Sequence, residues 1–387
     1  NLREKLTFLQ VMTGCTGDEV AYKGTLKSGS SSYSITDTDW LNFRIDAFKE
    51  YKKAFYDGDV STRVPMLFNN VTPDEGSFAL AWDWVVANIG TGFGIKGSAY
   101  ARGHHLDSEL DFKNTWYDKL VNPQSLALFS RCEMDQSFTK PLYQINVPLG
   151  FYWGMLSGLN TGLCVWDLSA GATQAAISDP AIMESIAFFN KYAGQIYPST
   201  ATSAYCVFHE GLNSANETKF PSATYGSPVS HGNEARYLAI CNATKYSSRG
   251  AKMDDSFAAT KGQVYQRDSQ TGYNDAGWQI EEGNYERWIT QIDPEGTSIG
   301  LFRVRGTIGA SSSKYDRFAR SFESSTGKNT MYFQLHNEFQ ANNKTLKFTV
   351  RWLDKNAGST WAFKYRNASG LQTLNFTGIG GNQWKVE

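Results

Sequence analysis

Leu126-Ala-Leu-Phe-Ser-Arg-Cys-Glu-Met-Asp-Gln136 is the most informative part of this sequence. It begins with apolar residues and without a turn former, as a buried strand does, and it ends with Arg131, Glu133 and Asp135. In a barrel of alternating strands and helices, functional side chains lie at the carboxyl ends of the strands. We therefore expect a barrel strand that presents Glu133 as a candidate catalytic carboxylate. The alternative is a strand that ends in an ordinary surface glutamate.

The segment that follows repeats this arrangement. A helix is expected from Pro141 to Asn160, and Thr161 to Leu168 is a second apolar strand, which ends in Trp166 and Asp167. Strand, helix and strand in succession, with polar residues at the strand ends, indicate repeated β/α units around a parallel sheet.

Three further strands, with helices between them, come before these two. The strands are expected at Leu6 to Thr13, Arg63 to Asn70 and Gly94 to Ala99, and the helices at Asp37 or Thr38 to Gly58 and at Glu75 to Ile89. The first strand ends in the turn Gly14-Cys-Thr-Gly-Asp-Glu19, which exposes two adjacent acids, Asp18 and Glu19. A last helix is expected from about Asp179 to Ala193.

Five strands are too few for a (β/α)8 barrel, which has eight. We expect residues 1–198 to form the C-terminal part of a TIM barrel, about strands four to eight, because an open remnant would leave an unpaired parallel edge. The missing strands would either precede residue 1 or come from a second polypeptide. A smaller open α/β sheet is the structural alternative.

The hydrophobic period changes in the second half of the chain. Residues 199–261 are expected to form a helical and irregular connector, with short helices at Ser203 to Leu212 and Glu234 to Tyr246. Residues 262–387 contain short alternating runs separated by Gly, Asn and Ser turns, which predict a β-sandwich of jelly-roll type. The runs are Thr297 to Val304, Met331 to Leu335, Leu346 to Trp352 and Thr360 to Tyr365.

The composition limits the classes of function. The chain has 387 residues, of which 14% are aromatic, and its net charge is −1. Aromatic rings stack on the apolar faces of sugars, so a chain rich in rings and poor in charge suits a carbohydrate ligand, although rings also fill cores. The lack of a basic excess argues against nucleic acid as a partner. No apolar run reaches the roughly 18 residues of a membrane span.

Cysteines and glycosylation sequons bear on metals and on location. The five cysteines are scattered and form no CxxC pair, so we expect neither a disulfide scaffold nor a metal site, and no cofactor. Six sequons indicate an extracellular, secreted glycoprotein. They lie at Asn70, Asn216, Asn242, Asn343, Asn367 and Asn375.

Two acids at the ends of different barrel strands, in a chain rich in Trp and Tyr, fit glycoside hydrolysis. At Glu133 and at Asp18-Glu19 the chain resembles the clan of retaining glycoside hydrolases built on (β/α)8 barrels, which includes β-galactosidases and agarases. In that clan the acid/base Glu ends strand four and the nucleophile Glu ends strand seven. The resemblance implies that Glu133 is the nucleophile and Glu19 the acid/base. Where the clan usually has Asn-Glu, this sequence has Asp18-Glu19, so Asp18 either takes the place of the sugar-binding Asn or is itself the acid.

Other residues are candidates for substrate binding. Trp166 and Asp167 would supply a stacking platform and an acceptor for a sugar hydroxyl. One of His104 and His105 would line the sugar pocket rather than bind a metal, because adjacent residues of an extended segment point to opposite sides. The remaining candidates are Arg131, Asp135, Tyr22 and Trp84.

The sequence thus favours a retaining glycoside hydrolase that cleaves a polysaccharide or oligosaccharide, of galactan type in view of the resemblance. The C-terminal sandwich is similar to the modules appended to such enzymes. The alternative is a non-catalytic extracellular glycoprotein that keeps a hydrolase-like fold for carbohydrate binding or structural assembly. The retained Glu19 and Glu133 favour the enzyme, whereas the sequons and the incomplete barrel favour the alternative.

Overall fold

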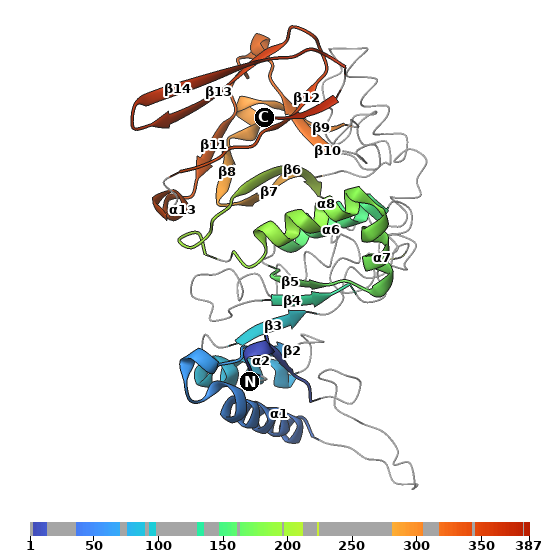
Figure 1. Ribbon diagram of the computed structural model, residues 1–387, viewed down its shortest axis with the longest axis vertical. Coiled ribbons are helices and arrows are strands. Elements are labelled where there is room, and N and C mark those ends of the chain that lie inside the picture. The colour runs from blue at the N-terminus through green and yellow to red at the C-terminus, as the bar shows by residue number, and fades with distance from the viewer. Residues whose placement is uncertain are drawn as a thin grey trace.

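The computed structural model describes residues 3–13, 36–69, 76–89, 93–97, 130–134, 147–160, 163–195, 197–211, 223, 281–304, 317–342, 345–381 and 383–387. Within them, a parallel sheet, a layer of helices and a set of antiparallel strand pairs follow one another along the long axis of the molecule (Figure 1). Helices α1 (Asp37–Tyr51) and α2 (Gly76–Asn88) lie at one end of this stack, and the C-terminal hairpins lie at the other.

Five strands form one parallel sheet. They are β1 (Leu9–Val11), β2 (Met66–Asn69), β3 (Phe93–Gly97), β4 (Ser130–Glu133) and β5 (Val165–Asp167). Their order in the sheet is their order in the chain, and each neighbouring pair is parallel. Parallel neighbours need a crossover, and α1, α2 and α6 (Val147–Asn160) lie in the connections after β1, β2 and β4. The expected succession of parallel strands is therefore confirmed, whereas closure into a TIM barrel stays a prediction.

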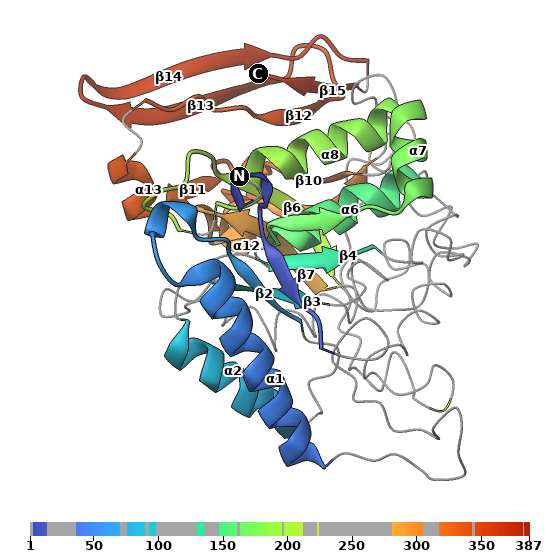
Figure 2. The same ribbon diagram turned by 60° about the horizontal axis from the view of Figure 1, so that its bottom comes forward.

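Helix α1 begins at a capping box. The Thr36 hydroxyl accepts a hydrogen bond from the Asp39 amide at 3.1 Å, and the Asp39 carboxylate accepts one from the Thr36 amide at 3.2 Å. The cap is thus Thr36, just before the Asp37 or Thr38 expected from the sequence. The side chains of Trp40 and Phe48 are buried on one side of the helix. The helix packs along α2 (Figure 2). The helix continues into one π-helical turn, η2 (Lys52–Tyr56).

Helices α6, α7 (Ala170–Ser178) and α8 (Pro180–Tyr192) form the layer next to β5 (Figure 1). Helices α6 and α8 lie side by side, and α7 precedes α8 (Figure 2). The buried side chains Phe151 and Met155 of α6 and Phe189 of α8 join Val11 and Met66 of the sheet in one core. Helix α8 lies where the sequence predicts it. Helix α7 was not expected, because alanines rather than large apolar residues form its buried side.

Residues 205–211 form a strand, so the helix expected from Ser203 to Leu212 is wrong. Strand β6 (Tyr205–Gly211) pairs along its whole length with β7 (Glu281–Arg287) in antiparallel register. The partner strand is far away in the chain, and a local pattern cannot reveal such a pairing. The second expected helix, Glu234 to Tyr246, lies outside the described residues.

The β6–β7 pair covers the other side of the helical layer. The buried rings of Tyr205 and Tyr285 belong to the same core as the helices. The guanidinium of Arg287 donates a hydrogen bond to the carbonyl oxygen of Leu159 near the end of α6. The helices are therefore packed between the parallel sheet and the first antiparallel strands.

The rest of the C-terminal part consists of antiparallel pairs: β8 with β11, β9 with β10, β12 with β15, and β13 with β14. Two of the four expected runs contain β9 and β11, the third covers the first six residues of β13, and the fourth overlaps only the start of β12. Their assembly into a sandwich stays a prediction. The strands are β8 (Ile289–Ile292), β9 (Ile299–Val304), β10 (Arg317–Ser321), β11 (Tyr332–Leu335), β12 (Arg351–Asp354), β13 (Thr360–Asn367), β14 (Gly370–Thr377) and β15 (Gln383–Val386).

The short helices of the described residues, in both halves of the chain, are η1 (Arg3–Lys5), η3 (Val60–Thr62), α12 (Pro294–Thr297), η8 (Ser324–Thr326) and α13 (Asn337–Asn342).

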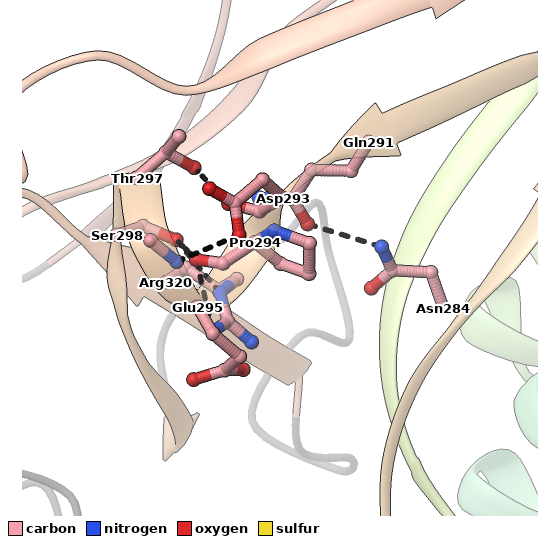
Figure 3. A network of polar contacts seen from close by, with 9 residues as sticks. Asn284, Gln291, Asp293, Pro294, Glu295, Thr297, Ser298 and Arg320 are labelled. Atoms are coloured by element: carbon pink, nitrogen blue, oxygen red, sulfur yellow. Dashed lines mark hydrogen bonds and ion pairs between the residues drawn. The ribbon is translucent and has the colours of Figure 1, made fainter.

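A buried arginine holds the turn between β8 and β9 (Figure 3). Nε of Arg320 donates to the Ser298 hydroxyl at 2.8 Å, and Nη2 forms an ion pair with Glu295 at 2.6 Å. Asp293, in the left-handed region with φ 43°, caps α12 by accepting a hydrogen bond from the Gly296 amide. The buried charge of Arg320, in β10, is thus compensated by Glu295 in the turn between β8 and β9. No helix in the described part of the chain is long and apolar enough to cross a membrane.

Candidate functional site

The polar residues expected at the ends of β4 and β5 lie side by side. Glu133 is the register partner of Asp167, and Arg131 precedes Glu133 by two residues and so shares its face of the sheet. Because all five strands are parallel, their carboxyl ends meet at one edge. This edge brings two acids and one arginine together.

Arg131 is the centre of what we call the polar cluster (Gln10, Arg131, Glu133 and Asp167). Its Nη1 donates to Oε1 of Gln10 in β1, and its Nη2 donates to Oδ2 of Asp167 and, at 3.4 Å, to Oε1 of Glu133. The guanidinium also lies over the ring of Phe8, with Cζ 5.8 Å from the centroid. The Arg131 side chain is 16% exposed, against 35% for Glu133 and 34% for Asp167. The arginine is therefore largely enclosed, whereas both acids are accessible from solvent.

These contacts require a curled sheet. Strands β1 and β5 are its two edges, and in a flat sheet they would lie about 19 Å apart, four spacings of about 4.8 Å. Yet Gln10 of β1 and Asp167 of β5 bond the same guanidinium, so their oxygens lie within roughly 8 Å of each other. The face that carries Arg131 is thus concave, and barrel strands have this curvature.

The two acids differ in how firmly they are held. Both accept a hydrogen bond from Nη2 of Arg131, so the bonded oxygens of Glu133 and Asp167 lie within about 6 Å of each other. The bond to Glu133 is long, whereas the ion pair with Asp167 is close. One positive charge therefore faces two carboxylates, and Arg131 holds Asp167 more closely than Glu133.

Two aromatic candidates belong to the hydrophobic core instead. The ring of Trp166 packs against the helical layer, 5.9 Å from Phe151 and 6.0 Å from Phe189. The ring of Trp84 lies 6.5 Å from Phe48, between α2 and α1. Neither tryptophan is brought to the polar cluster, so the stacking platform expected at Trp166 is not at this site.

The other predicted site residues lie outside the described residues. They are Asp18, Glu19, Tyr22, His104, His105 and Asp135. The strand that precedes the first three, β1, leaves the sheet at the same edge at which Glu133 ends β4. The assignment of Glu19 or Asp18 as acid/base therefore stays a prediction.

Gln10 and Phe8 are members of the site that sequence reasoning missed. The sequence contains one indication for Gln10, which is a polar residue between the apolar residues Leu9 and Val11 of a short strand. Phe8 gave none, because an aromatic residue before a strand is ordinary. Both meet Arg131, which lies more than a hundred residues away in the chain.

The described residues do not support metal chemistry or catalysis by a thiol. No group of three or more His, Cys, Asp or Glu side chains among them could hold a metal ion. Cys206 in β6 is mostly buried beside Glu286, and burial, followed by the charge of Glu286, raises the pKa of its thiol. Since the thiolate is the reactive form, Cys206 is a packing residue rather than a nucleophile.

Comparisons with known proteins gave no match: no protein-family model, no curated protein and no solved structure matches this chain. The polar cluster and the strands that position it are therefore the observations from which a function can be inferred.

Proposed function

We propose that the protein is a retaining glycoside hydrolase that acts on a polysaccharide or oligosaccharide. The observation that supports this most is the position of Glu133, at the carboxyl end of β4, on the concave face and accessible from solvent. Catalytic groups of β/α barrels lie at this edge of the sheet. The resemblance to galactan-degrading hydrolases suggests a galactan-type substrate.

In this proposal Glu133 is the nucleophile. Arg131 donates a hydrogen bond to Glu133, and in a retaining mechanism the nucleophilic carboxylate attacks the anomeric carbon. Asp167 is bound more closely to the same arginine. Its role is to bind a sugar hydroxyl or to balance the charge of Arg131.

The acid/base must then come from another strand. Glu19 is the first choice and Asp18 the second, since both follow β1 at the catalytic edge of the curled sheet. The proposal requires the carboxyl group of this acid to lie about 5 Å from that of Glu133, as in a retaining pair.

The proposal extends to partners and location. Within the described residues, β1 and β5 have one neighbour each, and we propose that further strands, from this polypeptide or a second one, complete the barrel. The sequon residues Asn367 and Asn375 are exposed, as glycan acceptors of a secreted protein must be. Carbohydrate is the proposed ligand, and nucleic acid is not.

Two glutamine variants test the assignment. Turnover is measured on p-nitrophenyl β-galactoside and on agarose. Glu133→Gln should lower kcat/KM by at least about 10⁴-fold on both, because the nucleophile is lost while volume and hydrogen bonding are kept. Glu19→Gln should stop cleavage of agarose but spare the aryl glycoside, whose leaving group needs no proton. The control is Glu184→Gln, which changes an exposed acid paired with Arg351 at 3.1 Å.

The results separate the proposal from its rival. NMR of the first product should show the anomeric configuration of the substrate. Full activity of both variants would exclude the proposed roles. If the wild-type protein binds agaro-oligosaccharides in calorimetry but never cleaves them, it is the non-catalytic carbohydrate-binding glycoprotein.

A further inference from the structure

We infer that Arg131 is a positioning residue that orients Glu133, and not a ligand of the substrate. The inference rests on the proposed role of Glu133 as nucleophile. It replaces the substrate-binding role that the sequence suggested for Arg131.

The first observation is how the donors of Arg131 are used. Both terminal nitrogens bond protein groups: Nη1 bonds Gln10, and Nη2 bonds Asp167 and Glu133. The side chain is 16% exposed, about half as much as either acid. The remaining nitrogen, Nε, is buried and has no hydrogen-bond partner. A substrate hydroxyl that approaches from solvent would meet the more exposed acids first.

The second observation is where the anchors come from. Gln10 and Phe8 hold the guanidinium from β1, and Asp167 holds it from β5, while Arg131 itself belongs to β4. Anchors on both edges of the sheet fix the guanidinium in three dimensions. A fixed guanidinium next to Glu133 restricts the rotamers of that side chain.

The third observation is the difference between the two carboxylates. The close ion pair with Asp167 anchors Arg131, whereas the 3.4 Å contact with Glu133 directs that carboxylate without enclosing it. The Glu133 side chain is 35% exposed, so a substrate can reach its carboxylate. The contact therefore aligns a nucleophile and leaves it reactive.

The test uses three variants and two readouts. Arg131→Met removes the guanidinium, Arg131→Lys keeps the charge, and Gln10→Ala removes only the β1 anchor. One readout is kcat and KM on p-nitrophenyl β-galactoside. The other is labelling of the Glu133 carboxylate with a water-soluble carbodiimide and glycine ethyl ester, quantified by mass spectrometry. This labelling does not depend on activity.

Arg131→Met should lower kcat by about 100-fold, the usual effect of a misaligned reacting group, and leave KM within about threefold. Labelling of Glu133 should increase severalfold, because the hydrogen bond from Arg131 is lost. Arg131→Lys should restore part of kcat. Gln10→Ala should lower kcat and increase labelling of Glu133, both to a smaller extent than Arg131→Met. If Arg131→Met does not fold, Gln10→Ala alone tests whether Arg131 orients Glu133.

Arg351→Met is the matched control, since it breaks an exposed pair and should change labelling of Glu184 but not of Glu133. A rise in KM with kcat unchanged would show that Arg131 binds substrate, and would overturn the inference. So would unchanged Glu133 labelling in both Arg131→Met and Gln10→Ala. If the wild-type protein has no hydrolase activity, the proposed function fails, but the labelling still decides whether Arg131 orients Glu133.

Discussion

Tyr205, the first residue of β6, joins the strand pair β6–β7 to helix α8, and its replacement by alanine tests this connection. Its side chain is buried, with 6% of the residue exposed. The ring stands edge-on to Tyr192, with centroids 5.1 Å apart and planes at 81°, and to Phe188 at 5.8 Å and 64°. These contacts place the start of β6 against α8.

The expected loss follows from this burial. Removing a buried aromatic ring costs about 3–5 kcal/mol of unfolding free energy, as transfer and cavity terms add. The edge-to-face pair with Tyr192 should account for about 1 kcal/mol of this, measured as the coupling in a double-mutant cycle with Tyr192→Ala. Ile177→Ala, at a 68% exposed site of α7, is the control and should cost less than about 0.5 kcal/mol.

Urea unfolding followed by circular dichroism measures the free energies, and amide hydrogen exchange reports on α8 itself. Tyr205→Ala should lower the protection of α8 amides, whereas Ile177→Ala should not. A cost for Tyr205→Ala below about 1 kcal/mol, with unchanged exchange in α8, would refute the packing of β6 on this helix. The short helix expected from the sequence would then be the better description.

Three further predictions concern the C-terminal part. The Lys385 ammonium and two backbone amides hold the pKa of Asp354 below its ordinary value of 3.8. The ionised carboxylate therefore stabilises the fold above that pH, and this contribution is lost as the pH falls through the lowered pKa. Asp354→Asn should thus lower the melting temperature at pH 7, and the difference from wild type should shrink in melts below pH 3.8. Arg320→Met should cost about 1–2 kcal/mol in urea unfolding because it removes the hydrogen bonds of a buried guanidinium to Ser298 and to the half-exposed Glu295. Arg351→Met, at the surface, should cost less than about 1 kcal/mol. In a secreting eukaryotic host, Asn375→Gln should remove one glycan mass from the intact protein, and an unchanged mass would show that this exposed sequon is not used.

The parallel sheet was predictable because its signals are local. Each strand is a short apolar run, and amphipathic or apolar helical segments separate the runs. The positions of Arg131 and Glu133 at the end of β4 follow from the same run. Only the order of polar and apolar residues was needed, and no distant contact had to be known.

Predictions failed where the determining contact is distant or where strand geometry was not applied. Strand β6 is formed by pairing with β7, about seventy residues later, so residues 205–211 looked like a helix on their own. Trp166 and Asp167 were expected to face one pocket, but adjacent residues of a strand point to opposite sides. The structure puts Asp167 in the polar cluster and Trp166 in the core.

The curvature of the sheet and the chemistry of the site depend on one another. In a flat five-stranded sheet, Gln10 and Asp167 could not reach a common guanidinium, because the edge strands would lie about 19 Å apart. Curling brings the edges together across the face that carries Glu133, and this supports the proposed barrel over the smaller open sheet. Arg131 is then more than a counter-ion for two acids. It links β1, β4 and β5 at the edge where catalysis is proposed. Replacing Gln10 in β1 should therefore change the labelling of Glu133 in β4.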